Sequence, residues 1–262
     1  ETARSYMEMG DSSLIPEFSS VYNNLGTIYL ESGSSPDAII CLEKAQELTP
    51  DSPEVIFNLG YAYLGLGNLP RARQMFEESR ELYANRYGRD HPNYALAIIQ
   101  GISVRARLEP FDESVLREIR EAERILIDNQ IDPADPMYVE CLDVYQAYYF
   151  KRKDYDKVIE TGERKLELIR KREGRQSAEY LDALISLTGS YSYLGEREIL
   201  DAVYEESDQL LSSLNEEEMQ DWRNVVESSK ASTYYYQEEY DLARRSLERV
   251  VEMDKDRILE QE

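Results

Sequence analysis

Few side chains in this sequence could carry out chemistry on a substrate. His91 is the only histidine, and Cys41 and Cys141 are the only cysteines. A thiol nucleophile needs a general base within hydrogen-bond reach, and no histidine lies near either cysteine along the chain. A lone histidine also lacks the partners that a catalytic or metal site requires. We therefore predict that the protein is not an enzyme and that it holds no metal and no cofactor.

The residues of reactive type have structural interpretations. His91 precedes Pro92, where a turn residue is favoured over a general base or a metal ligand. Gly60 and Gly67 fall inside a helical pattern rather than in a phosphate-binding loop. Both cysteines also lie in amphipathic helical patterns, so each is predicted to be a small buried hydrophobe.

Acidic residues dominate the charge of the chain. There are 53 Asp and Glu against 30 Lys and Arg, which gives a formal net charge of −23. This charge repels the phosphate backbone of nucleic acids and anionic membrane surfaces, so neither is an expected partner. It favours a basic peptide or protein segment as the partner. The plainer alternative is that the acidity keeps an extended surface soluble.

The expected location is the cytoplasm. Apolar runs such as 94–99 are too short for a membrane span or a signal peptide. Two cysteines without a disulfide or metal spacing suit a reducing interior. The sequence begins with Glu1 rather than Met, which indicates a processed chain or an excerpt of a longer one.

A repeat, rather than a reactive group, is the main signal of the sequence. Two stretches align without gaps when 34 is added to each residue number. The second copy contains Ile56, Leu59, Gly60, Tyr63, Gly67, Ala72, Phe76, Ser79 and Ala84. In the first copy Leu25, Ile28 and Tyr29 fall on one face of a helix. Gly26 and Ala38 are small where two antiparallel helices must approach closely.

These nine positions resemble the tetratricopeptide repeat, which places Leu-Gly and Tyr on a first helix and Ala, an aromatic and Ala on a second. The resemblance implies an all-α fold: an α-solenoid of about six antiparallel helix-turn-helix hairpins that forms a right-handed superhelix.

The repeat continues in a longer form. The small or apolar residues that open the second helices lie 34, 42, 44, 42 and 43 positions apart, at Ala38, Ala72, Ser114, Val158, Leu200 and Ala243. The first-helix aromatic recurs as Tyr149, Tyr191 and Tyr234, which are expected in the core. With its Gly-x-x-His-Pro turn, the long form resembles the repeats of kinesin light chains. The third unit matches least, because Arg105 replaces the usual aromatic.

This register predicts the domain organisation. A short N-terminal helix and turn occupies 1–18, the solenoid 19–252, and a charged helical tail 253–262. Asn215 is expected to cap the first helix of the sixth unit. The predicted units are 19–52, 53–86, 93–130, 136–172, 178–214 and 216–252.

In the tetratricopeptide architecture the first helices line a concave groove, so their non-packing residues are the candidate binding residues. They are Asn23, Thr27, Phe57, Tyr61, Ser103, Asp143, Ala147, Asp182, Tyr193 and Tyr235. For Tyr61 and Tyr193, packing against the next hairpin is the alternative. The clamp with which some relatives hold heat-shock protein tails has one match, Asn58, and lacks its cations.

The expected function is that of a non-enzymatic scaffold or adaptor, which binds a peptide or protein segment in the groove. The alternative is the sensor or regulatory region of a larger protein, such as a transcriptional regulator or a caspase-like protease with appended repeats. An attached effector domain in the full reading frame would discriminate between the two.

Overall fold

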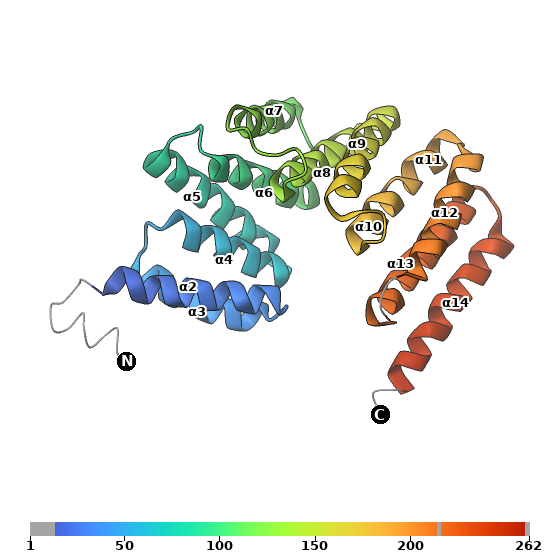
Figure 1. Cartoon of the computed structure of the whole chain (residues 1–262), viewed down its shortest axis with the longest axis horizontal. Helices are drawn as coiled ribbons and strands as arrows, with labels where there is room; N and C mark the ends of the chain where they lie inside the picture. The colour runs from blue at the N-terminus through green and yellow to red at the C-terminus, as the bar shows by residue number, and fades with distance from the viewer. Residues whose placement is uncertain (1–13, 214–215, 260–262) are drawn as a thin grey trace. The chain divides into compact units, whose positions relative to one another are not determined.

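The computed structural model describes residues 14–213 and 216–259, and every element in these ranges is a helix. The chain divides into two compact units, Glu1–Ile131 and Asp132–Glu262. In both units consecutive helices pair as antiparallel hairpins that pack on their neighbours (Figure 1). The predicted all-α solenoid fold is thereby confirmed.

Residues 14–131 of the N-terminal unit form three hairpins, drawn from blue to green in Figure 1. Their helices are α2 (Ile15–Glu31) with α3 (Ser35–Leu48), α4 (Pro53–Gly65) with α5 (Leu69–Tyr87), and α6 (Pro92–Leu108) with α7 (Glu113–Asp128).

The C-terminal unit also contains three hairpins. They are α8 (Pro136–Lys151) with α9 (Tyr155–Glu173), α10 (Ala178–Ser186) and α11 (Thr188–Leu194) with α12 (Arg197–Leu211), and α13 (Glu216–Tyr236) with α14 (Tyr240–Leu259). The first helix of the middle hairpin is interrupted at Leu187, which separates α10 from α11. The expected cap Asn215 and the segments 1–13 and 260–262 lie outside the described residues.

Proline and short polar side chains set where the helices begin. Proline occupies the first turn of α2, α3, α4, α5, α6 and α8, where its missing N–H leaves no helical hydrogen bond unmade. His91 is the N-cap of α6: its Nδ1 accepts a hydrogen bond from the Asn93 N–H at 3.2 Å. Its ring stacks on Tyr87 with centroids 4.9 Å apart. The structural interpretation of the only histidine is confirmed.

Small residues let the two helices of a hairpin approach closely. A Cβ on Gly26 would lie 2.6 Å from Leu42, and one on Gly60 would lie 2.6 Å from the Phe76 ring. Ala38 and Ala72 are fully buried on the second helices of the same hairpins. Both cysteines are buried, as predicted, and neither forms a disulfide.

The third hairpin departs from the pattern of the others. Val115 is fully buried, whereas the predicted packing residue Ser114 is only half-buried, so the expected register there was wrong by one position. Arg105, which replaces the repeat aromatic, pairs with Glu118 at 3.0 Å between α6 and α7. Its side chain keeps only 17% exposure. An ion pair therefore fills the place where the other hairpins use a ring.

None of the described helices combines the length and the apolar character that a bilayer crossing requires. The same part of the chain contains no group of three His, Cys, Asp or Glu side chains arranged to hold a metal ion.

Candidate functional site

The candidate binding residues of the first hairpin satisfy one another. The Asn58 amide of α4 donates to Asn23 Oδ1 at 2.9 Å and to Thr27 Oγ1 at 3.4 Å. Thr27 in turn donates to the Asn23 carbonyl at 3.1 Å. This polar cluster joins α2 to α4 and engages Asn23 Oδ1 and Thr27 Oγ1 within the protein.

Phe57 belongs to the core and not to an open groove. It keeps 8% exposure, and its ring contacts Tyr61, Phe76 and Tyr83 edge-on at centroid distances of 5.1, 5.3 and 6.4 Å. Tyr61 is half-buried and meets Phe76 at 5.4 Å. The expected groove role of Phe57 is corrected, because its ring packs in the hairpin core against Phe76 and Tyr83.

The other candidates of the middle hairpins are dispersed. Ser103 and Ala147 are half-buried, and Asp182 is exposed. Asp143 accepts a bond of 2.5 Å from Lys165, whose side chain is 6% exposed. Burial raises the pKa of the Asp143 carboxyl, although part of its side chain reaches solvent, and the Lys165 ammonium opposes this by lowering the pKa.

Tyr193 and Tyr235 are part of a larger surface in the C-terminal unit. We name it the aromatic ladder and define it as six residues: Phe150, Tyr155, Tyr193, Tyr235, Tyr236 and Tyr240. All six lie within two residues of the turn inside a hairpin, at the end of its first helix or the start of its second. Because the helices of a hairpin are antiparallel, these ends meet at one edge of the unit.

Ring contacts make the ladder continuous across three hairpins. Tyr155 and Tyr193 stack with centroids 4.6 Å apart and planes 4° from parallel. Tyr193 reaches Tyr236 of the next hairpin at 5.7 Å, and Tyr235 meets Tyr240 at 5.7 Å. Five of the six side chains are nevertheless 46% to 64% exposed, the exception being half-buried Tyr155. Contact among neighbours therefore leaves about half or more of each of these five side chains open to solvent.

The ladder hydroxyls differ from those of the buried tyrosines. Tyr191 donates to Glu163 at 3.3 Å, and Tyr180 donates to Glu206 at 3.2 Å. Among the described residues, by contrast, the hydroxyls of the ladder tyrosines have no hydrogen-bond partner. These hydroxyls can therefore donate hydrogen bonds to a ligand or accept them from it.

Charges around the ladder are balanced, unlike those of the whole chain. The ladder turns, taken together with the adjoining helix-end residues Lys151 of α8 and Arg197 of α12, are the segments 151–154, 195–197 and 237–239, and they carry four basic and four acidic residues. Arg197 pairs with Glu239 from one turn to the next. The surface is therefore aromatic and locally neutral.

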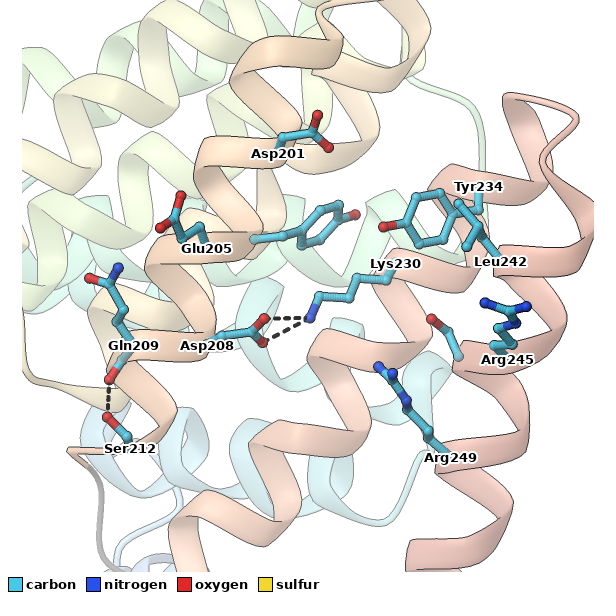
Figure 2. A pocket seen from close by; sticks show the side chains of 12 residues that line it. Asp201, Glu205, Asp208, Gln209, Ser212, Lys230, Tyr234, Leu242, Arg245 and Arg249 are labelled. Carbon is cyan, nitrogen blue, oxygen red and sulfur yellow. Dashed lines mark hydrogen bonds and ion pairs between the residues drawn. The ribbon is translucent and has the colours of Figure 1, made fainter.

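A separate hollow of about 700 Å³ lies among α12, α13 and α14 (Figure 2). Lys230 lies within it, and its ammonium donates to both oxygens of Asp208 at 2.8 and 2.9 Å. Glu227 lies 3.3 Å from Lys230 and 3.4 Å from Arg249. Burial raises the pKa of Tyr234 on its wall, and the nearby Lys230 opposes that shift. Lys230 and Arg249 thus form ion pairs with Asp208 and Glu227 inside the protein. We interpret the hollow as a place where ion pairs connect the last two hairpins.

Sequence comparisons identify the repeat. A family model described as TPR repeat matches 26–67, and models described as tetratricopeptide repeat match 58–93 and 229–257. The chain contains tetratricopeptide (TPR) repeats. No curated protein matches it in sequence.

Solved structures similar to this TPR protein share its fold at low identity. BtubC (BKLC) from P. vanneervenii is 13% identical, with 87% of this chain and 91% of that chain covered and a TM-score of 0.63. A kinesin light chain structure of nearly identical TPR-like repeats from Podosopora anserina is 16% identical, with coverage of 77% and 95% and a TM-score of 0.57. PilW, a type IV pilus biogenesis factor, is 12% identical, with coverage of 87% and 90% and a TM-score of 0.60. These likenesses show the fold alone.

The sequence does contain a signal for the ladder that the repeat pattern alone overlooks. Phe150, Tyr193 and Tyr236 recur at intervals of 43 residues. Each follows the repeat aromatic of its first helix (Tyr149, Tyr191 or Tyr234) by one or two residues. Tracking that second aromatic through the TPR units identifies one ladder residue in each hairpin. Tyr155 and Tyr240 follow them across the turns.

We predict that Lys230→Met destabilises the TPR protein by about 1–3 kcal/mol. The change leaves Glu227, whose side chain is 12% exposed, with Arg249 as its remaining cation. The expected loss of stability is kept below that of a fully buried ion pair, because the Asp208 side chain is 55% exposed and solvent screens its charge. Urea denaturation measures the effect. Arg245→Met is the matched control: Arg245 lines the same hollow, has no ion pair among the described residues, and should change stability by less than about 0.5 kcal/mol.

Proposed function

We propose that this TPR protein is a non-enzymatic scaffold that binds a protein or peptide segment, and that the aromatic ladder is the binding surface of its C-terminal unit. The observation that carries the proposal is a continuous row of exposed rings across three hairpins. The TPR fold supports a role in protein–protein interaction, and we propose the ladder as the surface that contacts the partner.

Exposed aromatic rings are the side chains best suited to such a surface. They offer a large contact area and have few rotatable bonds, so little conformational entropy is lost on binding. Contiguous apolar surface of this kind is uncommon on a protein unless it binds a partner. Core packing does not explain it, because the fold buries other tyrosines, among them Tyr148, Tyr191 and Tyr204.

The accessible first-helix positions extend the proposed surface. Tyr193 and Tyr235 belong to the ladder, and the proposal retains Ala147 and Asp182 as first-helix positions of the same unit that a longer segment could contact. Ser103 is retained as a separate candidate of the N-terminal unit. Asn23, Thr27 and Asp143 contribute less, since other side chains already occupy their polar groups. The partner segment is therefore expected to lose most affinity when ladder residues are changed.

Capture of partners with matched variants tests the proposal. The unsubstituted chain and two variants, Tyr193→Ala/Tyr236→Ala and Ile40→Ala/Val225→Ala, are immobilised, and bound proteins are identified by mass spectrometry. The control positions are 54% and 43% exposed and lie outside the ladder. A partner that is lost with the tyrosine variant and retained by the control supports the proposal. Identical sets of partners on all three proteins would contradict it.

Affinity for the ladder should depend weakly on salt. Raising the ionic strength from 50 to 500 mM shortens the Debye length from roughly 14 to 4 Å and weakens attraction between exposed charges. Because the ladder turns carry equal numbers of acids and bases, we expect a change of less than about twofold. Titration calorimetry at both salt concentrations measures it. A loss of tenfold or more would instead indicate a basic partner attracted by the net charge of −23.

A further inference from the structure

The chemistry of the aromatic ladder is specific enough to indicate the class of its ligand. Three properties occur together there: exposed rings in a row, tyrosine hydroxyls with no partner among the described residues, and balanced charge in the adjoining turns. A ligand that matches all three needs flat apolar groups, hydrogen-bond acceptors and no strong net charge.

We infer that the ladder binds a neutral proline-rich segment in the polyproline II conformation, an inference that rests on the proposed function. Such a segment makes no internal hydrogen bonds, so its carbonyl oxygens are free to accept from tyrosine hydroxyls. Proline has no N–H, which suits a surface that offers donors. Its ring packs flat on an aromatic face, and aromatic-lined surfaces are an established means of recognising this conformation.

The spacing of the rings is compatible with this ligand. Neighbouring rings along the ladder are 4.6 to 5.9 Å apart from Tyr155 to Tyr240. A polyproline II helix advances about 9 Å in each three-residue turn. A segment with proline at every third position would therefore meet every second ring, and the rings between would be left to contact the intervening residues.

The same properties argue against other partners. An arginine-rich segment would also stack on tyrosine rings, but the three ladder turns provide as many cations as acids and so give it no electrostatic preference. A helical segment has its carbonyls already engaged in its own hydrogen bonds, so its backbone would not accept from the ladder hydroxyls. A polyproline II segment is also largely ordered before it binds, so binding costs it little entropy.

The test compares three synthetic peptides with the full chain. The first is neutral with proline at every third position, the second replaces each proline by alanine, and the third replaces two neutral residues of the first by arginine. Calorimetry is expected to show that the first binds at least tenfold more tightly than the second and within threefold of the third. Equal binding of the proline and alanine peptides, or a tenfold preference for the arginine peptide, would overturn the inference.

Two variants separate the contributions of rings and hydroxyls. Tyr193→Ala/Tyr236→Ala should abolish binding of the proline peptide. Tyr193→Phe/Tyr236→Phe/Tyr240→Phe keeps the rings and should weaken binding by threefold or more without abolishing it. An unchanged affinity for the phenylalanine variant would contradict the hydroxyl–carbonyl contact and with it this class of ligand. All substituted side chains are exposed, so circular dichroism melting should show unchanged folding.

The outcome is distinguishable from failure of the proposed function. If the proline peptide does not bind but a captured partner still depends on the ladder, the scaffold function stands and the ligand class is wrong. If neither the proline peptide nor any captured partner depends on the ladder for binding, the ligand class and the proposed binding surface are both wrong. Sedimentation of the free protein examines the remaining alternative: a dimer that dissociates in the Tyr193→Ala/Tyr236→Ala variant would identify a second copy as the occupant and overturn the inference.

Discussion

Ala72→Arg is expected to unfold the second hairpin and with it the cooperative structure of the N-terminal unit. Ala72 is fully buried on α5, where the repeat places a small residue at the crossing of the two helices. An arginine there would bury a charge without a partner or force the helices apart. The expected loss exceeds about 4 kcal/mol, which is a large part of the stability of an ordinary domain.

Chemical denaturation followed by circular dichroism measures this effect. Gln74→Arg adds the same side chain at an exposed position two residues along the same helix, and it should leave the unfolding midpoint nearly unchanged. If Ala72→Arg and Gln74→Arg unfold at the same denaturant concentration, the register of the second hairpin must be wrong.

Phe76→Ala should cost about 3–5 kcal/mol of stability, as expected when a fully buried aromatic side chain is removed. Phe76 has no exposed surface, and its ring contacts Phe57 and Tyr61 while covering Gly60. The close approach of helices at Gly60 prevents easy collapse, so a cavity should remain. Thermal and urea denaturation both report the loss.

Leu66→Ala provides the control for that prediction. Leu66 follows α4 in the same hairpin but is 50% exposed, so its truncation should change the stability by less than about 1 kcal/mol. Comparable losses for the two variants would show that Phe76 is not the centre of the hairpin core.

The repeat was predictable from sequence because its packing depends on residue size at fixed intervals. Gly26, Gly60 and Ala72 are small where helices touch, and these positions do not depend on distant parts of the chain. The same holds for the turn at His91, which is decided by the next residue being proline. Local chemistry and a constant period together determine the hairpins.

The candidate site was harder to predict because the fate of an aromatic side chain depends on its three-dimensional neighbours. Phe57 occupies a first-helix position that could have faced a ligand, yet its ring is buried against Phe76 and Tyr83 of the second helix. Leu25 and Ile28 have the spacing of packing residues but are 37% and 58% exposed, because no preceding hairpin in the described residues covers α2.

The ladder combines residues that the repeat pattern treats separately. The repeat pattern predicts Tyr193 and Tyr235 as groove residues of first helices, whereas Phe150, Tyr155, Tyr236 and Tyr240 lie beside the hairpin turns, outside the predicted groove. Ring contacts between successive hairpins join them into one surface, and such contacts depend on how neighbouring hairpins stack. The 43-residue spacing of these aromatic residues is visible in the sequence, but the exposure of their side chains to solvent is not.

The most direct measurement is the affinity of a captured partner segment for the full chain and for Tyr193→Ala/Tyr236→Ala, determined by titration calorimetry at equal folded fraction. If the rings of the C-terminal edge hold the partner, the variant binds at least about tenfold more weakly, since truncating one central aromatic contact commonly costs more than about 1 kcal/mol. Equal affinity for both proteins, with both fully folded, would show that the partner binds elsewhere.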